Sequence, residues 1–207
     1  MDIISRVKNI LVCPKTEWQT IEAENEPHAK VFTTYVVLLA IIPAVAAFIG
    51  YGLIVPKGYR VAADFAAAHG ISSASSNFLA LGLRHAIVQY ITMLGSTYLT
   101  AFVIDALAEN YGAQKNFNRA FALVAYAYTP MFIGGVFYIL PSLSWITLLA
   151  GAYGLYLLYI GLQPMMKATE EKQTIYFVIS LIVTMVVWAV VYAILNAILL
   201  NGTYFKF

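Results

Sequence analysis

The chain has 207 residues, of which 61% are hydrophobic and 11% are charged, and its formal net charge is +2. So small a charge, carried by scattered basic residues, argues against a protein that binds nucleic acid. A single cysteine, Cys13, excludes an intrachain disulfide and a metal site built from several cysteines.

Residues 1–30 predict a cytoplasmic segment that lies in the membrane interface. A helix over residues 2–12 would place apolar side chains on one face. These are Ile3, Val7, Ile10 and Leu11. Pro14 ends this helix and a second short amphipathic helix follows, in which the ring of Trp18 is expected at the depth of the lipid headgroups. The alternative is an amphipathic terminus packed on the rest of the protein.

Five long apolar stretches follow this segment. A helix needs about 20 apolar residues to cross a hydrocarbon core ~30 Å thick, and its peptide groups must be hydrogen-bonded within the helix. The stretches lie at residues 31–55, 83–105, 120–140, 143–163 and 175–200. We therefore expect an all-α, polytopic integral membrane protein with five transmembrane helices, a membrane domain over residues 31–200 and a short tail over residues 201–207. The third and fourth spans are so close in sequence that they must form an antiparallel hairpin.

The distribution of basic residues predicts the orientation of the chain. Positively charged flanks resist translocation across the membrane, so the side with more Lys and Arg is cytoplasmic. Eight of these residues fall on the side of the N-terminus and four on the opposite side. The N-terminus is therefore expected in the cytoplasm and the C-terminus outside.

The charges at the two ends of the second span are the first candidate site. Arg84 and His85 stand at one end, and Asp105 and Glu109 stand at the other, about 31 Å away along a helix. Charges at these depths are costly unless they are paired or hydrated. The two acids could form a cation or proton entry site, or a structural salt bridge between cytoplasmic loops. The candidate cationic partners for that bridge are Lys115, Arg119, Lys167, Lys172 and the N-terminal basic residues.

A polar stripe runs along the same span. Its members recur at steps of three or four residues and therefore share one helix face. They are His85, Gln89, Thr92, Ser96 and Thr100. Such a stripe either lines a hydrated path or forms hydrogen bonds that hold neighbouring helices together.

Pro130 predicts a kink in the third span. Its ring has no N–H, so the carbonyl of Tyr126 loses its usual helical donor. This carbonyl, with Tyr128 and Thr129, is a candidate site for a cation or a lipid headgroup, and Lys167 belongs to the same expected headgroup site. The alternative is a structural kink that the neighbouring helices tolerate.

Small residues in the fourth span predict a helix-packing seam. Gly151, Gly154 and Gly161 recur along it, and Ala150 with Gly154 forms a pair of small residues four positions apart. Such pairs allow close helix contact, here with the third span or with another copy of the chain.

No motif in the chain indicates catalysis. An activated nucleophile, a metal-binding pair of histidines and a glycine-rich phosphate loop are not found at suitable spacings. The three histidines lie in separate segments. The sequence therefore predicts a protein that is not an enzyme and that has neither a cofactor nor a metal site.

Three segments resemble the Yip1 domain family in its prokaryotic branch. They are LVCPKTEWQTIEAE at 11–24, AYAYTP at 125–130 and GAYGLYLLYIGLQPMMKATEEK at 151–172. The resemblance implies five spans, a cytoplasmic N-terminus and a place in the bacterial cytoplasmic membrane. Eukaryotic relatives act in vesicle trafficking and contact small GTPases, but only 30 residues precede the first span here, so GTPase binding is not carried over.

Two functions remain open at this point. The first is a non-enzymatic, Yip1-like protein that organises the membrane or partner proteins, with the lipid bilayer, a membrane protein or a second copy of the chain as partner. The alternative is a small permease or channel that moves an ion or small solute along the second span.

Overall fold

The computed structural model describes residues 2–56, 58 and 78–199, and every regular element in these ranges is helical. Four helical stretches are long and apolar enough to cross a membrane. They run over His28–Ile54, Phe78–Tyr111, Phe117–Ile139 and Ile146–Met166. This confirms the all-α, polytopic membrane class. The expected tail, residues 201–207, lies outside the described residues.

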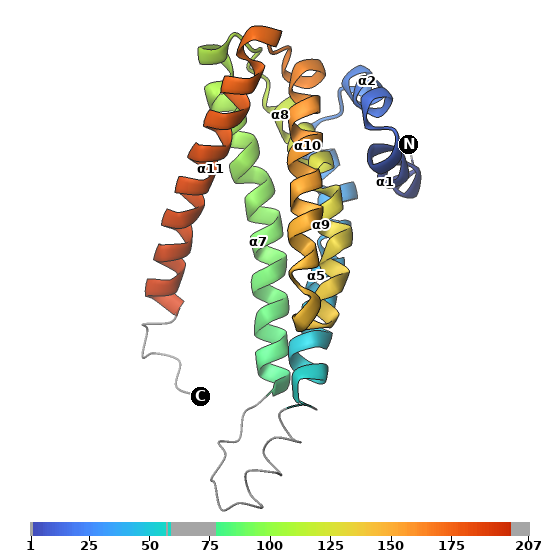
Figure 1. Cartoon of the computed structure of the whole chain (residues 1–207), viewed down its shortest axis with the longest axis vertical. Coiled ribbons are helices and arrows are strands. Elements are labelled where there is room, and N and C mark those ends of the chain that lie inside the picture. Colours follow the sequence, from blue (N-terminus) through green and yellow to red (C-terminus); the bar gives the residue numbers. More distant parts are fainter. Residues whose placement is uncertain (1, 57, 59–77, 200–207) are drawn as a thin grey trace, which may run out of the picture.

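Two short helices precede the bundle. Helix α1 covers Ile3–Val12 and α2 covers Pro14–Glu24, with Pro14 in the first turn of α2, where its missing N–H costs no hydrogen bond. Figure 1 shows the pair beside the upper part of α10, at the opposite end of the molecule from the start of α7. Helix α1 contacts α8 and α9, and α2 contacts α10. The N-terminal segment is therefore docked on the bundle.

The first span is a chain of short helical pieces. It consists of α3 (His28–Val31), the π-helical η1 (Phe32–Val36), α4 (Val37–Leu39), α5 (Ile41–Ala47) and the π-helical η2 (Phe48–Ile54). The α-helical pattern is interrupted at Ala40, one turn before Pro43, which cannot donate to the carbonyl of Leu39.

The second and third spans follow. The second is α7 (Phe78–Leu107) with the 3₁₀ turn η3 (Ala108–Tyr111). The third consists of α8 (Phe117–Ala127), α9 (Thr129–Gly134) and the 3₁₀ turn η4 (Gly135–Ile139). The helix breaks at Tyr128, as Pro130 predicts.

The last two helices complete the arrangement. A 3₁₀ turn, η5 (Pro141–Leu143), leads into α10 (Ile146–Met166), which packs against α8 and α9 and so forms the expected hairpin with the third span. Helix α11 (Glu170–Leu199) covers the stretch expected to be the fifth span and contacts α7 and α10. It is not among the four helices identified as candidate spans, so the count of five stays a prediction.

The third span lies at the centre of the bundle. In its most apolar part 72% of the residues are buried, against 28–44% in the other three spans. The uninterrupted run from Ala120 to Ala127 is buried on all sides. A site formed around the third span is therefore enclosed by the other helices.

The first two spans cross at a pair of glycines. A Cβ atom added to Gly82 would lie 2.5 Å from the Cα atom of Gly52, which is closer than real Cβ contacts allow. Because this neighbour is backbone, only a shift of a whole helix could make room for it. The crossing of α7 over η2 therefore depends on the absence of side chains here.

We expect Gly82→Ala to lower the thermal unfolding temperature of the protein in detergent, because α7 and η2 must separate to accept the methyl group. Gly95→Ala, in the same helix, is the matched control, since a Cβ there meets nothing within 4 Å. The control is expected to be neutral or slightly stabilising, because alanine favours helix over glycine by ~1 kcal/mol. Equal unfolding temperatures for the two variants would show that the glycine crossing does not matter.

Candidate functional site

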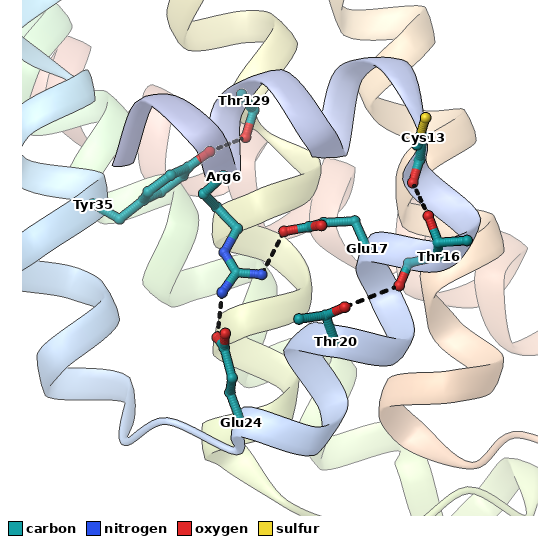
Figure 2. Close-up of polar contacts among 8 residues, drawn as sticks. All are labelled: Arg6, Cys13, Thr16, Glu17, Thr20, Glu24, Tyr35 and Thr129. Atoms are coloured by element: carbon teal, nitrogen blue, oxygen red, sulfur yellow. Dashed lines mark hydrogen bonds and ion pairs between the residues drawn. The ribbon is translucent and has the colours of Figure 1, made fainter. Parts of the chain in front are cut away.

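A buried arginine joins the two N-terminal helices. Arg6 of α1 is only 4% exposed, and its guanidinium donates hydrogen bonds to Glu17, at 2.6 Å, and to Glu24, both in α2. Figure 2 shows the guanidinium between the two carboxylates. The sequence pattern places Arg6 off the apolar face of α1, whereas the structure buries it, because the turn at Cys13 brings α2 back over α1. A buried charge of this kind must be paired, and here two acids pair it.

The same arginine reaches the third span. The Cζ atom of Arg6 lies 5.3 Å from the centre of the Tyr126 ring, within the range of a cation–π contact. Helix α1 is thereby placed against α8 at the end of α8 where the helix breaks. Sequence spacing offers no signal for this contact, since the two residues are far apart in the chain.

The carbonyl of Tyr126 is not free, although Pro130 cannot donate to it. The Thr129 hydroxyl donates to this carbonyl at 2.7 Å. The hydroxyl of Tyr35, in the first span, lies 2.7 Å from the same Thr129 oxygen (Figure 2). Because a threonine hydroxyl has one proton, Tyr35 must be the donor in that second bond. The expectation of an unpaired carbonyl is therefore wrong, and the Thr-Pro pair supplies its own substitute donor.

Three of the five residues in the polar stripe of the second span are engaged in packing contacts, namely His85, Ser96 and Thr100. Thr100 forms a hydrogen bond of 2.8 Å with the hydroxyl of Tyr128, and the Ser96 hydroxyl donates to the carbonyl of Met93 in its own helix. The ring of His85 stacks on Tyr51 of the first span, with centres 4.1 Å apart. These contacts favour packing over a hydrated path.

Asp105 and Glu109 lie at the far end of α7 from Arg84 and His85, as expected. Asp105 is 9% exposed and its Oδ1 atom has no hydrogen-bond partner within the described residues, while Glu109 is exposed. Within the residues that the structure describes, neither Asp105 nor Glu109 forms an ion pair. The salt bridge that the sequence suggests between these acids and a cytoplasmic base is therefore not formed among the described residues.

Glu22 of α2 takes two of the candidate cations for Asp105. Its carboxylate lies 3.2 Å from Arg119 of α8 and 2.9 Å from Lys167, at the end of α10. Lys167 is thus paired with Glu22. The hydrogen bond and charge of Lys167, followed by the charge of Arg119, hold the pKa of Glu22 below its ordinary value of 4.5. The three residues tie α2 to two spans.

The lowered pKa of Glu22 predicts a pH dependence. A depressed pKa in the folded state contributes stability above the unfolded pKa, and this contribution is lost as the pH falls through the lower, folded-state pKa. We expect the unfolding temperature of Glu22→Gln to lie below that of the wild type at pH 7. The gap should close below pH 4.5. Thermal unfolding in detergent across this pH range measures it, with Glu171→Gln as the control acid. A gap that persists at the lowest pH would contradict the role of the charge.

The glycine seam of α10 is used within the chain at two of its three positions. Trp18 of α2 is 1% exposed, and a Cβ on Gly161 would lie 2.7 Å from the Trp18 ring and 2.5 Å from Leu123. A Cβ on Gly154 would lie 2.9 Å from the carbonyl oxygen of Ala127, in the third span, whereas Gly151 meets nothing within 4 Å. Trp18 is therefore packed on the bundle, because Gly161 leaves a recess that the indole fills, and its depth relative to the lipid headgroups stays a prediction.

The other half of the small-residue pair also contacts the third span. A Cβ on Gly134, at the end of α9, would lie 2.7 Å from the Cβ of Ala150. Ala150 and Gly154 therefore pack together on the third span, which is one of the two contacts that their spacing predicts.

Comparison with known proteins places this architecture in a family. The model of the Yip1 domain matches residues 8–192, from within α1 to within α11. The chain belongs to the Yip1 domain family. Two relatives are both named Inner membrane protein YohC, one from Escherichia coli K12 and one from Escherichia coli O6:H1 strain CFT073. Each is 29% identical over 177 residues, which cover 82% of this chain and 83% of the relative. No solved structure matches significantly.

The family match confirms the resemblance and includes the docked helices. Because it begins at residue 8, α2 and the second half of α1 are part of the Yip1 domain. This Yip1 domain protein is a transmembrane protein related to inner membrane proteins. Within the described residues no three His, Cys, Asp or Glu side chains gather as metal ligands do.

Proposed function

We propose that this Yip1 domain protein is a non-enzymatic protein of the bacterial inner membrane that organises the membrane or partner proteins. In this proposal α11 is the fifth span, the N-terminus is cytoplasmic and the C-terminus is outside. One observation carries the proposal. Three residues of the polar stripe in the second span are engaged in packing contacts, while the docked helix α1 keeps two exposed apolar side chains, Ile4 and Val12.

The two exposed apolar side chains of α1 support an interfacial position for this helix. Ile10 of α1 is fully buried against the bundle, whereas Ile4 and Val12 of the same helix are 74% and 68% exposed. Lys8 is exposed between them on the same side of α1, and exposed apolar side chains beside a lysine suit the boundary between headgroups and acyl chains. The helix would then touch the lipid with one face and the spans with the other.

Photo-crosslinking in living cells tests the organising role. A crosslinking amino acid at Ile4 is expected to capture a defined membrane protein or a second copy of the chain. The same amino acid at Phe102, an exposed position on α7, is the control for random lipid-facing contacts. Identical products at the two positions, or lipid adducts alone at Ile4, would contradict the proposal of a specific partner.

The orientation is tested with cysteine labelling. Cys13 is exposed and is the only cysteine in the chain. In intact spheroplasts a membrane-impermeant maleimide should leave Cys13 unlabelled and should label a cysteine placed at position 207 in a Cys13→Ser background. If both positions are labelled in intact spheroplasts, or if both are labelled only after the membrane is permeabilised, the two ends lie on the same side of the membrane. Either result would contradict five spans.

The permease alternative is favoured by one observation. Asp105 is a buried acid in a helix suited to cross the membrane, and its Oδ1 atom has no partner within the described residues. Intramembrane acids of this kind often mark ion pathways. Vesicles containing the purified protein are expected to conduct no more ions than empty vesicles. A current through the wild-type protein that is lost in Asp105→Asn but kept in Glu109→Gln would establish the permease function instead of the organising function.

A further inference from the structure

A cavity opens between α1, the start of the first span and α8. Its volume is about 270 Å³, and its wall includes Asp2, Arg6, Glu26, Lys30, Tyr35 and Tyr126. This is slightly below the ~300–1,000 Å³ of pockets that hold a drug-sized ligand. The cavity therefore has room for a small polar group.

The depth of the cavity in the membrane follows from its position in the first span. Lys30 and Tyr35 lie in the first turns of the span His28–Ile54, where the chain enters the apolar region. Lipid headgroups occupy this depth. Helix α1, which closes one side, carries the exposed apolar residues that suit the same depth.

The charges around the cavity favour a ligand with a positive group. Arg6 is neutralised by Glu17 and Glu24, and Lys30 is paired with Glu26. Asp2 has no side-chain capping bond to α1, and it takes part in no ion pair within the described residues. Both bases of the wall therefore already have carboxylate partners, and the Asp2 carboxylate is left to attract a cation.

Other groups in the wall suit an anionic oxygen. The Lys30 side chain is 58% exposed, so its ammonium can bind a further acceptor beside Glu26, whose side chain is 22% exposed. The Tyr126 hydroxyl has no hydrogen-bond partner within the described residues, and Tyr126 lines the cavity. Acid and donor groups thus face the same small volume, which is the pattern that a zwitterion requires.

We propose that this cavity binds a phosphoammonium zwitterion, with its ammonium held by Asp2 and Glu26 and its phosphate by Lys30 and the Tyr126 hydroxyl. This chemistry is available from two sources: the headgroup of phosphatidylethanolamine in the adjacent leaflet, and free phosphoethanolamine. A quaternary ammonium headgroup fits less well, since it has no N–H to donate to the two carboxylates.

Isothermal titration of the full-length, C-terminally tagged protein in detergent tests the proposal. The probes are dihexanoyl phosphatidylethanolamine, the matching phosphatidylcholine and phosphatidylglycerol, and phosphoethanolamine. We expect the ethanolamine lipid to bind at least fivefold more tightly than the other two lipids. Asp2→Asn should remove most of this preference, and it should fold normally because Asp2 makes no capping bond. Lys8→Gln, an exposed change on the same helix, is the control.

The outcomes distinguish the lipid headgroup from free phosphoethanolamine as the ligand, and they show which results contradict the proposal. Binding of phosphoethanolamine as tight as that of the lipid supports the site with a soluble source, whereas binding of the lipid alone supports the headgroup. Equal binding of all three lipids, or an ethanolamine preference unchanged in Asp2→Asn, overturns the proposal. An affinity for the ethanolamine lipid that Tyr126→Phe leaves unchanged would contradict the phosphate contact. Neither result bears on the crosslinking experiment at Ile4, so this inference can fail while the organising function stands.

Discussion

Trp18→Ala is expected to lower the free energy of unfolding by about 3–5 kcal/mol, the usual cost of truncating a large buried aromatic side chain. The indole is 1% exposed and fills the recess that Gly161 leaves between α10 and Leu123 of α8. Its removal leaves a cavity that stiff helices on either side cannot close. The change should show as an earlier midpoint in reversible unfolding by SDS in mixed micelles, followed by circular dichroism.

A local measurement distinguishes loss of docking from general damage. Lys15 lies at the start of α2 and is exposed, so trypsin should cut there faster when α2 leaves the bundle. Trp145→Ala is the control for loss of a tryptophan, because Trp145 is 57% exposed. If Trp18→Ala unfolds and is cut at Lys15 no differently from Trp145→Ala, the recess at Gly161 does not hold α2.

Arg6→Met should be equally disruptive, for an electrostatic reason. Removing one partner of a buried ion pair leaves an uncompensated charge, which typically costs about 3–5 kcal/mol. Glu17 is 4% exposed and would be the charge left behind. The same SDS titration measures the loss, and Lys8→Met, an exposed substitution in α1, is the control.

A combined variant tests whether the charge or the shape of Arg6 matters. Apolar or neutral replacement of a whole buried ionic group is often tolerated. Arg6→Met together with Glu17→Gln and Glu24→Gln is therefore expected to recover most of the stability lost in Arg6→Met. If the triple variant is as unstable as the single one, the stacking of Arg6 on Tyr126 carries the effect instead.

Together these contacts make the N-terminal helices part of the domain. Three interactions fasten α2: the Trp18 recess, the Arg6 carboxylates, and Glu22 with Arg119 and Lys167. In addition, the Tyr153 hydroxyl of α10 donates to the carbonyl of Leu11 at the end of α1. A surface fixed at this many points can present α1 to lipid or to a partner in one defined orientation, which an organising protein needs.

Features that depend on local sequence were predictable. An uninterrupted apolar stretch has one stable form in lipid, so hydropathy alone is enough to locate the four candidate spans that the structure has. Pro130 removes a donor wherever it sits, so the break at Tyr128 follows from the sequence. Small side chains at Ala150 and Gly154 permit a close helix contact in any fold, and the hairpin turn at Pro141 makes the third span the nearest candidate for it.

The candidate site depended on contacts between distant segments. Hydropathy marks Arg6 as polar and therefore outward, but α2 folds back over it and supplies two carboxylates. Lys167 and Arg119 are plausible partners for Asp105, yet α2 places Glu22 between them. The sequence by itself determined which segments are helical and belong in the membrane, since that depends on each segment's own free energy of transfer. The tertiary structure alone decided which charges meet, because the rotation of each helix and the docking of α1 and α2 are set by packing across the whole bundle.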